Sequence, residues 1–557
     1  MFSLATIPNI ARNARRFKEI AGILSKYGFA EFLSASAPDF FQNMARSTDG
    51  AKLTSMSREV RLQQALAELG GAFVKLGQII STRADLVGPE VAAALASLRA
   101  DTEPDPPAVV RELIAAELGG PPETLFASFD DHAIASASIG QVHRAVLADG
   151  TRVVVKIQHA GIDAKIRADC DIFLGLAELA ERGLVELRLY QPMAVATAMR
   201  RSILRELDFV REERNLRHFA ANFTEDPRVV FPRTFPDLST RRVLTMEELV
   251  GDSVAEVAAR PRTPDEAARL AKLARNTADV FLEMIFRDGF FHADPHPGNI
   301  LILQGDRVGL LDCGMVGLLD DRIRRTLEDA LLAVVEGDAE ALAEQVMRLG
   351  RLPPDLDREG LQADVEDFVG DYANQAVGTF DLSGALTDVA ALVRRHGILL
   401  NPTVAHLIKV FVVLEGASRS LHPGFSLIEM ITPYYATIMA RRISPEHLLK
   451  RLRRGLRDVN ALLETLPRDL TEILHRAREG RLDIHLVHQG LEGTVNRLVY
   501  GLISAALFLG SCLLLANRVP PLLYDISIFG ALGCLGALVL GLRLLRAIRR
   551  SGELGGQ

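Results

Sequence analysis

The spacing of apolar residues along this chain predicts helices in some segments and strands in others. Between residues 62 and 80, apolar side chains recur every three or four positions, which is typical of one face of an amphipathic helix. The stripe consists of Leu62, Leu66, Leu69, Phe73, Leu76 and Ile80. Lys75 and Gln78 lie three residues apart beside it, so we expect one helix that points both polar side chains the same way.

A second helical pattern lies near the N-terminus, between Ile10 and Tyr27, and basic residues accompany it. Its apolar members are Ile10, Ala14, Phe17, Ala21 and Leu24. Such a helix either lies on an anionic membrane surface or packs on its own protein, and the sequence leaves both alternatives open. The segment also resembles a mitochondrial transit peptide, whereas the continuous apolar stretch of a secretory signal is missing.

Near the other end, two apolar stretches follow one another, Leu498 to Ala516 and Ile526 to Leu542, with Pro520 and Pro521 between them. The first is long enough to span a bilayer and the second nearly so, which predicts a transmembrane helical hairpin. On the second helix small residues form a strip suited to close helix packing, namely Gly530, Gly533 and Gly536.

Arginines flank this hairpin, and only Arg518 lies in its turn. Positive charge gathers on the cytoplasmic side of membrane proteins, so both flanks are predicted to be cytoplasmic. The flanking residues are Arg478, Arg481, Arg497, Arg543, Arg546, Arg549 and Arg550. We therefore expect a cytoplasmic body attached to a bacterial inner membrane by two C-terminal transmembrane helices.

A β-hairpin is predicted between residues 292 and 312. Two apolar runs, 300–303 and 308–311, are separated by a four-residue connection with turn chemistry. If Leu303 pairs with Val308, Asn299 lies opposite Asp312 at the open end of the hairpin. Two hard oxygen ligands there suit Mg²⁺. Asp294, in the preceding loop, could orient or deprotonate a hydroxyl. The alternative is a surface hairpin in which Asp and Asn are ordinary turn residues.

Two further segments carry charged residues of interest. Lys156 ends the apolar run 153–155, where a lysine is usually a solvated edge residue. The segment 205–215 is predicted to be a helix, on which Asp208 and Glu212 are four residues apart and repel each other unless a cation lies between them. Lys156 is one candidate partner for Glu212. The alternative is an exposed charged helix with local arginine partners.

Together Lys156, Asp294, Asn299 and Asp312 form the set of side chains used for phosphoryl transfer in kinases. A protein kinase also needs a long activation segment after the metal-binding Asp, but here a helix is predicted to start near Asp320. A peptide-docking surface is therefore not expected. A small or lipid-like ligand near the bilayer fits better.

Composition narrows the class of protein. With 557 residues and 48% hydrophobic composition, the chain can form two to four domains with sizeable cores. A formal net charge of −7 gives no overall basic field for nucleic acid. The cysteines are scattered without a CxxC pair, which fits a reducing compartment and argues against structural zinc; they are Cys170, Cys313, Cys512 and Cys534.

Four segments resemble, in order, the motifs of the UbiB family of atypical kinases, also described as aarF-domain-containing kinases. Residues 75–78 resemble its KxGQ motif, Glu206 to Asp208 its ExD motif, and His292 to Asn299 its catalytic loop. The segment before the strand of Lys156 resembles its alanine-rich loop; the residues are Ala135, Ser136, Ala137, Ser138, Ile139, Gly140 and Gln141.

This resemblance implies an α+β, protein-kinase-like bilobal fold in which the KxGQ helix covers the active site. Lys75 and Gln78 would face the nucleotide, with Lys75 near Glu206 and Lys156 paired to Glu212. The alanine-rich loop, Lys156 and Glu212 would bind the nucleotide, and Asn299 and Asp312 would bind metal. The implied catalytic residues are Asp294, Lys156, Lys75, Gln78, Glu206 and Asp208.

The resemblance also implies ATP or ADP, Mg²⁺ and a role in isoprenoid quinone biosynthesis, usually of ubiquinone. The implied partners are membrane lipids, prenylated phenolic quinone precursors and other proteins of that pathway; the oligomeric state, including a homodimer, is left open. Cys313 departs from the family, which usually has Phe there, and weaker packing between the lobes is expected.

The implied domains run along the chain as a basic N-terminal region (1–50), a helical extension with the KxGQ motif (51–130), an N-lobe (131–250), a C-lobe (251–425), a helical region (426–495) and the transmembrane hairpin (496–550). Two other functions stay open. One is a small-molecule phosphotransferase like the aminoglycoside and choline kinases, and the other is a non-catalytic, lipid-binding pseudokinase.

Overall fold

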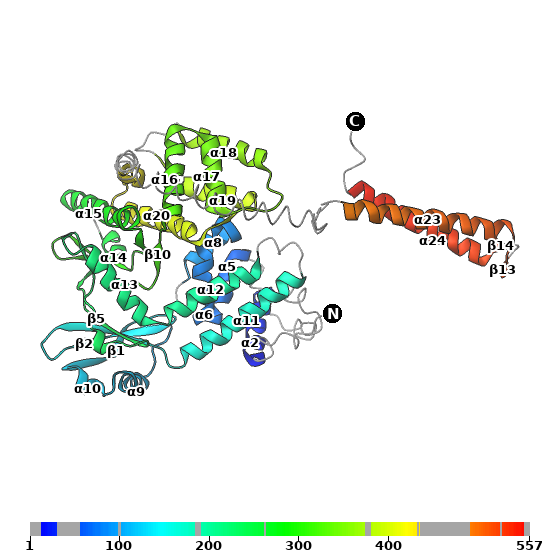
Figure 1. Cartoon of the computed structure of the whole chain (residues 1–557). Coiled ribbons are helices and arrows are strands. Elements are labelled where there is room, and N and C mark those ends of the chain that lie inside the picture. The colour runs from blue at the N-terminus through cyan, green and yellow to red at the C-terminus, as the bar shows by residue number, and fades with distance from the viewer. Residues whose placement is uncertain are drawn as a thin grey trace, which may run out of the picture. The chain divides into compact units, whose positions relative to one another are not determined.

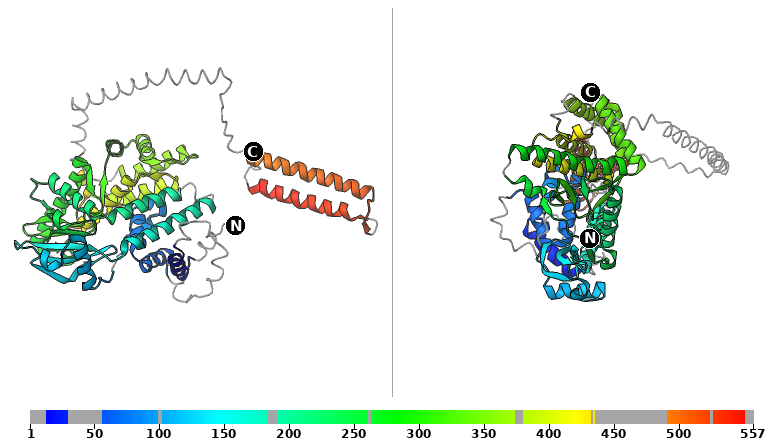
Figure 2. Two further views of the ribbon diagram at one scale, coloured as in Figure 1. Left: turned by 60° about the horizontal axis from the view of Figure 1, so that its bottom comes forward. Right: turned by 90° about the vertical axis from the view of Figure 1, so that its left-hand side faces the viewer.

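The computed structural model describes residues 13–29, 56–98, 102–183, 191–260, 263–373, 380–431, 434, 491–523 and 526–550. The chain divides into two compact units, 1–444 and 445–557. Figure 1 shows the elements of both units, and the further views in Figure 2 show the larger unit as a mixture of helices and sheets.

The first sheet of the larger unit is antiparallel and has the strand order β1-β2-β3-β5. Its strands are β1 (Ser128–Ser136), β2 (Gly140–Val146), β3 (Arg152–Gln158) and β5 (Val243–Glu247). Val153 and Val155 face a core shared with α9 (Pro107–Leu118), whereas Val154 faces the core shared with α13 (Phe209–Asn222). Both faces are covered, which explains the unbroken apolar run, and alternation turns Lys156 toward α13.

The second half of this unit is mostly helical and carries short strands. One sheet has the order β4-β9-β8-β6, and β10 pairs with β7. These strands are β4 (Val229–Val230), β6 (Gly251–Ser253), β7 (Phe290–His292), β8 (Ile300–Leu303), β9 (Arg307–Leu310) and β10 (Val316–Leu318). Helices α14 (Val254–Ala258), α15 (Pro264–Glu283) and α20 (Pro402–Leu421) contact these strands. The remaining helices of this half pack on one another and on α20; they are α16 (Asp321–Glu336), α17 (Ala339–Leu349), α18 (Arg358–Ala373) and α19 (Leu382–Arg395).

The predicted β-hairpin is present as β8 and β9, but the predicted register is wrong by one residue. Leu303 pairs with Arg307, and Ile300 with Leu310. The turn has three residues rather than four, because Gly305 and Asp306 both adopt positive φ, a conformation that tightens the connection. Asn299 is consequently opposite Leu311, whose N–H donates to the Asn299 carbonyl oxygen at 2.9 Å.

The stripe between residues 62 and 80 lies on two helices instead of one, α5 (Arg58–Leu69) and α6 (Gly71–Ser81). Gly70 separates them with φ of 75° and ψ of −171°, a conformation outside the helical region. The apolar side chains still share one core, together with helix α11 (Ile162–Gly183). Periodicity therefore identified the buried face but not the break.

The N-terminal pattern forms α2 (Ala14–Lys26), which packs on its own protein. Phe17, Ile20 and Ala21 are buried in the same core as α5 and α6. Arg16 binds the buried carboxylate of Asp169 on α11, with 2.7 Å between Nε and Oδ1. Of the two alternatives for this helix, the packed one is present; Ile10 lies outside the described residues.

The segment 205–215 is not the single helix that was predicted. Helix α12 (Pro192–Glu206) ends there, and α13 starts at Phe209. Asp208 is the residue before α13, with φ of −116° and ψ of 89°. Asp208 and Glu212 therefore do not face each other across one helical turn, and the predicted repulsion between them does not arise.

The predicted absence of a long activation segment is confirmed. After Gly314 the chain forms only the three-residue strand β10, which pairs with β7, before α16 begins. Asp320 caps that helix, since its Oδ1 accepts hydrogen bonds from the N–H groups of Arg322 and Ile323.

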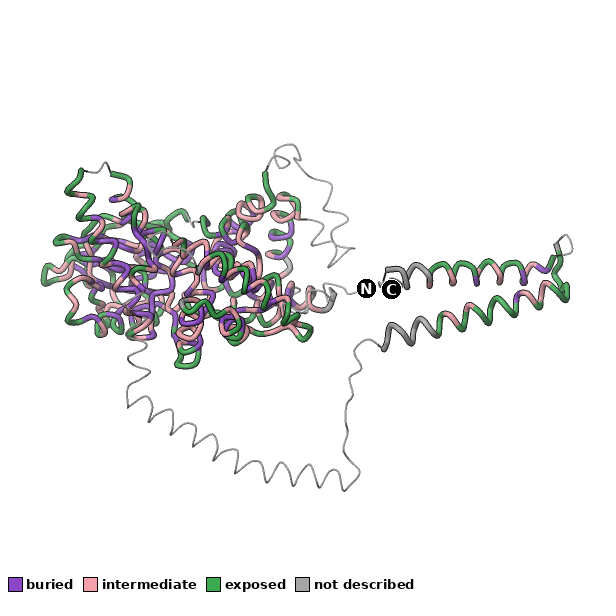
Figure 3. Tube along the Cα trace, turned by 90° about the horizontal axis from the view of Figure 1, so that it is seen from above, coloured by how far each residue is buried: buried purple, intermediate pink, exposed green. Residues whose placement is uncertain are grey.

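The C-terminal unit contains two antiparallel helices, α23 (Leu491–Ala516) and α24 (Ile528–Arg550). Figure 3 shows them as largely exposed, in contrast to the buried interior of the larger unit. The glycine strip packs on α23 as predicted: a Cβ atom on Gly530 would lie 3.0 Å from the Ser511 carbonyl oxygen. Of the described helices, only α23 has an apolar segment long enough to cross a membrane, Val499–Ala516. The apolar part of α24, Ile528–Leu544, is shorter, so the predicted helical hairpin is present but only one of its two helices is confirmed as a candidate membrane span.

We expect Gly77→Ala to lower the melting temperature of the protein. A Cβ atom at Gly77 would lie 2.3 Å from Cδ1 of the buried Leu98, and overpacking of this kind costs about 1–3 kcal/mol. The matched control is Gly22→Ala on α2, where no atom lies within 4 Å and the helix gains up to about 1 kcal/mol. Thermal unfolding measures both, and a Gly77 variant as stable as the Gly22 variant would contradict the packing described here.

Candidate active site

Lys156 lies at the centre of the candidate site. Its Nζ atom is 2.8 Å from both carboxylate oxygens of Glu212, on α13, and 3.5 Å from Oδ1 of Asp312. Nζ also lies 5.2 Å from the centre of the Phe209 ring. The pairing of Lys156 with Glu212 that the sequence suggested is present, and one ammonium group connects β3, α13 and the segment after β9.

The charges at this site depend on one another. Burial alone would lower the pKa of Lys156, but the carboxylates of Asp312 and Glu212 raise that pKa above its ordinary value. Lys156 in turn holds the pKa of Asp312 well below its usual range. Burial raises the pKa of Glu212, so this carboxylate needs the Lys156 ammonium group to stay ionised.

The backbone turns sharply at Asp312, which has a positive φ of 45°. The Asp312 side chain is 53% exposed, and its Oδ1 accepts a hydrogen bond from the Gly314 N–H at 3.3 Å. A Cβ atom on Gly314 would lie 3.1 Å from that same oxygen and 3.8 Å from Oε2 of Glu212. Glycine at 314 therefore leaves room for the two carboxylates to approach Lys156.

Cys313 is completely buried in the main core. Its carbonyl oxygen accepts a hydrogen bond from the Asn215 side chain, on α13, at 2.8 Å. Burial raises the pKa of the Cys313 thiol well above its usual value, so it stays protonated. The backbone at Cys313, where the resemblance led us to expect Phe, therefore attaches the segment after β9 to α13.

His292 organises the loop that contains Asp294. Its Nδ1 accepts a hydrogen bond from the Asp294 N–H at 3.1 Å, so Nε2 carries the proton and donates to the Leu311 carbonyl oxygen at 3.2 Å. The Asn299 amide nitrogen donates to the Asp294 carbonyl oxygen at 3.4 Å, which leaves the amide oxygen for a ligand. Leu311, next to Asp312, is bonded to Asn299, so the two predicted metal ligands belong to neighbouring segments.

Sequence reasoning missed Lys409, on α20, whose Nζ lies 3.1 Å from Oδ1 of Asp294. It also missed His406, one turn earlier: burial, with the charges of Lys409 and Arg83, lowers the pKa of His406 to about 4. A signal existed, because Lys409 is the one polar residue within the otherwise apolar run 407–414.

Lys75 and Glu206 form a second, largely buried ion pair, with 2.7 Å between Nζ and Oε2. Burial alone would lower the pKa of Lys75, but Glu206, then Asp312 and Asp294, raise it. Lys75 is therefore paired with Glu206, as the KxGQ resemblance implied, and the charges of Asp312 and Asp294 act on it as well.

Gln78 does not point with Lys75 toward these carboxylates, contrary to our expectation. Its Nε2 donates to the Leu98 carbonyl oxygen at 3.1 Å, which holds the end of α8 (Pro89–Ala96) against α6. Further along, Asp85 on α7 (Ala84–Val87) accepts a hydrogen bond from the Leu400 N–H at 3.2 Å. The N-terminal extension is thus attached to the helical half of the larger unit.

The alanine-rich segment joins β1 to β2. Ala135 and Ser136 end β1, and the Ala137 N–H donates to the Gly140 carbonyl oxygen across the turn. At Gly140 the strands approach so closely that a Cβ atom would lie 2.3 Å from the Ile157 carbonyl oxygen. Ser138 and Ile139 are buried, and the Gln141 side chain is bonded to the backbone N–H of Asp105 at 2.6 Å. The turn is rigidly held.

Asp208 lies apart from this site. It lines a groove with arginines of α12 and α13, and no ion pair links it to Lys156 or Lys75 in the part of the chain that the structure describes. Among these residues there is also no cluster of three or more His, Cys, Asp or Glu side chains that could hold a metal ion. A metal here would depend on the kinase-type pair of one carboxylate and one amide.

Family models match three segments that make up most of the chain. The ABC1 atypical kinase-like domain matches residues 97–346, the UbiB helical domain 365–426, and the ABC1/UbiB kinase-like C-terminal domain 483–550. The two halves of the larger unit thus form a kinase-like fold with mixed helix and sheet content.

Curated relatives match three quarters or more of this chain. A probable protein kinase UbiB of Azotobacter vinelandii is 32% identical over 472 residues, which are 83% of this chain and 85% of that protein. Another of Pseudomonas aeruginosa is 31% identical over 423 residues, or 75% of this chain and 79% of that protein. An uncharacterized protein in the hydrogenase 1 5' region of Clostridium pasteurianum is 29% identical over 551 residues, or 97% and 99%.

Among solved structures, the complex of Rv3197 with erythromycin from Mycobacterium tuberculosis is similar to this chain with a TM-score of 0.39 and 24% identity. The match covers 61% of this chain and 92% of that one. A likeness at this level carries no argument about this chain.

We expect Lys75→Met and Glu206→Gln each to lower the free energy of unfolding, because each leaves a buried partner unpaired. The double variant should recover part of the loss, with a coupling of about 1–3 kcal/mol in a double-mutant cycle of denaturant unfolding. The control is the same cycle on Lys26 and Glu68, an exposed pair for which the coupling should be much smaller. Equal couplings in the two cycles would refute a special role for the Lys75 pair.

Proposed function

This chain belongs to the UbiB family of atypical kinases, and from that premise we propose that it uses ATP with Mg²⁺ at a membrane to support isoprenoid quinone biosynthesis, usually of ubiquinone. The observation that carries the proposal is the position of Lys156 between Glu212 and Asp312. This is the ion-pair arrangement that phosphoryl-transfer enzymes of the kinase type need in their active state.

The residues present suit the nucleotide and its metal. Asp312 offers an ionised, half-exposed carboxylate and Asn299 an amide oxygen, which are the hard ligands that Mg²⁺ prefers. Lys156 is the cation available to the phosphates. When bound, Mg²⁺ neutralises charge on the phosphate oxygens.

Asp294 is the proposed residue that orients or deprotonates the attacking hydroxyl or water. Its ion pair with Lys409 holds the carboxylate against α20. Lys409 is thus proposed as a positioning residue, which keeps Asp294 in place while leaving it 34% exposed.

The C-terminal unit supports the proposed membrane location. Large apolar side chains of α23 are exposed, including Leu502, Ile503, Leu509 and Leu513, and a soluble protein rarely exposes such a continuous apolar surface. We propose that α23 crosses a bacterial inner membrane with α24 packed against it, and that the kinase-like unit lies on the cytoplasmic side.

The proposed substrates are lipid-like. No activation segment is present between Gly314 and Asp320 to present a peptide, and the chain has an apolar anchor. Prenylated phenolic quinone precursors in the bilayer fit both facts, either as phosphoryl acceptors or as lipids made accessible by ATP hydrolysis. Membrane lipids and other quinone-biosynthesis proteins are the proposed partners.

We expect Asp294→Asn to reduce ATP turnover by roughly 10²- to 10⁴-fold, the range for removal of a general base. The assay uses purified full-length protein with and without anionic liposomes and phenolic headgroup analogues. Asp306→Asn, in the turn of the same hairpin, should retain the wild-type rate. Equal background rates for the wild type and Asp294→Asn in every condition would instead favour a non-catalytic, lipid-binding role.

The physiological role can be tested in a deletion strain complemented with Asp312→Asn. We expect quinone content to remain at the level of the deletion, because the variant lacks the proposed metal-binding carboxylate, whereas Asp306→Asn should restore it. Extraction and quantification of quinones measures the outcome. Full rescue by Asp312→Asn would mean that metal-bound nucleotide is not needed.

A further inference from the structure

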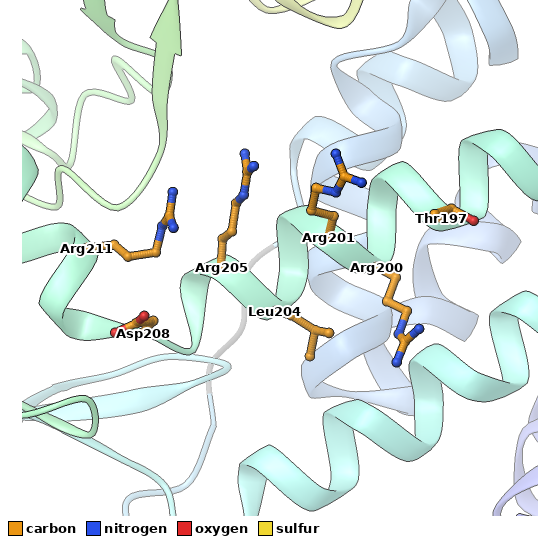
Figure 4. A pocket seen from close by; sticks show the side chains of 7 residues that line it. All are labelled: Thr197, Arg200, Arg201, Leu204, Arg205, Asp208 and Arg211. Carbon is orange, nitrogen blue, oxygen red and sulfur yellow. The ribbon is translucent and has the colours of Figure 1, made fainter.

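A groove of about 390 Å³ lies along the corner between α12 and α13, outside the site described above. Figure 4 shows the side chains that line it: Arg201, Arg205 and Arg211 extend to the same side of the two helices, whereas Arg200 and Leu204 extend the other way. Thr197 and Asp208 complete the lining.

The three arginines on one side, Arg201, Arg205 and Arg211, are called the arginine triad below. All three are exposed, and none forms an ion pair with any residue that the structure describes. Other arginines behave differently: Arg228 lies within 4 Å of three carboxylates. Arg201 and Arg205 are four residues apart on one helix, a spacing at which like charges repel.

The chemistry of the triad favours one class of ligand. Guanidinium groups stay charged at every physiological pH and match the oxygens of a phosphate group with two parallel hydrogen bonds. Three such groups from two helices converge on one groove. The Thr197 hydroxyl already donates to the Met193 carbonyl oxygen at 2.7 Å, so the arginines are the main donors.

We propose that the arginine triad is a binding site for a phosphate-bearing anion, separate from the nucleotide site at Lys156. The ligand bridges α12 and α13, because Arg201 and Arg205 belong to the first helix and Arg211 to the second. Binding itself does not rest on the proposed catalytic activity. The phosphate is supplied either by a free phosphate compound or by the headgroup of an anionic phospholipid.

Bridging at this corner has a consequence for the active site. Arg205 directly precedes Glu206, the partner of Lys75, and Arg211 directly precedes Glu212, the partner of Lys156. An anion bound to arginines of both α12 and α13 therefore limits the movement of the Glu206 and Glu212 carboxylates. The site is placed to couple phosphate binding to the order of the Lys156–Glu212 pair.

The test compares the full-length wild type with the double variant Arg205→Gln/Arg211→Gln in neutral detergent. The control, Arg214→Gln/Arg217→Gln, removes the same charge from α13 but leaves the groove intact. Inorganic pyrophosphate is titrated by calorimetry without added metal. We expect the wild type and the control to bind it and the triad variant to bind roughly tenfold or more weakly.

A second arm uses vesicles of phosphatidylcholine with or without phosphatidylglycerol. Loss of pyrophosphate binding in the triad variant supports a free phosphate compound as ligand, whereas loss of phosphatidylglycerol-dependent vesicle binding alone supports a lipid headgroup. Pyrophosphate should also raise the melting temperature of the wild type but not that of the triad variant. The melting curve of the variant without pyrophosphate distinguishes a folding defect from a loss of binding. The proposal is overturned if the triad variant binds both probes like the control, or if the wild type binds neither.

Because these readouts measure binding and not ATP turnover, their outcome is independent of the Asp294→Asn assay. A protein without ATPase activity could still bind phosphate at the triad. An active enzyme could equally lack this site.

Discussion

The ammonium group of Lys156 is the interaction on which the rest of the candidate site depends. Its charge opposes the effect of burial, which raises the pKa of Glu212, and it lowers the pKa of Asp312, a residue at a turn with positive φ. Each partner comes from a different element, so a single cation sets the position of β3, α13 and the segment after β9 relative to one another. Gly314 contributes to this arrangement, because a Cβ atom there would crowd Oδ1 of Asp312.

Three further contacts, made by side chains of α6 and α7, hold the N-terminal extension in place next to the candidate site. Lys75 joins α6 to the end of α12, Gln78 holds the segment after α8, and Asp85 attaches α7 to the strand at Leu400. The same extension forms a core with α2 and α11. The helices of the N-terminal extension are therefore an integral part of the kinase-like unit. One of their contacts with it is the ion pair between Lys75 and Glu206.

Two features bear on the kind of substrate: the lack of a long activation segment after Gly314 and the apolar surface of α23 and α24. The short path from Gly314 to Asp320 contains no long segment that could present a peptide, and the C-terminal helices expose many large apolar side chains. The arginine triad lines a groove at the corner next to the Lys75–Glu206 and Lys156–Glu212 ion pairs. The proposed phosphate chemistry at a membrane would account for all three features.

The sequence by itself determined the elements with strong periodicity or motif spacing: the apolar faces of α2, α5 and α6, the β-hairpin and the short path to α16. It offered the pairing of Lys156 with Glu212 only as one alternative, which the family resemblance favoured and the structure contains. It could not place the breaks at Gly70 and Leu207, the one-residue register shift, or the direction of Gln78, because local backbone geometry and packing decide these. The sequence also could not predict the partner of Lys409 or the grouping of the arginine triad. Their roles arise from residues far apart in the chain, and only the tertiary structure brings Lys409 to Asp294 and sets three unpaired arginines on one side of two helices.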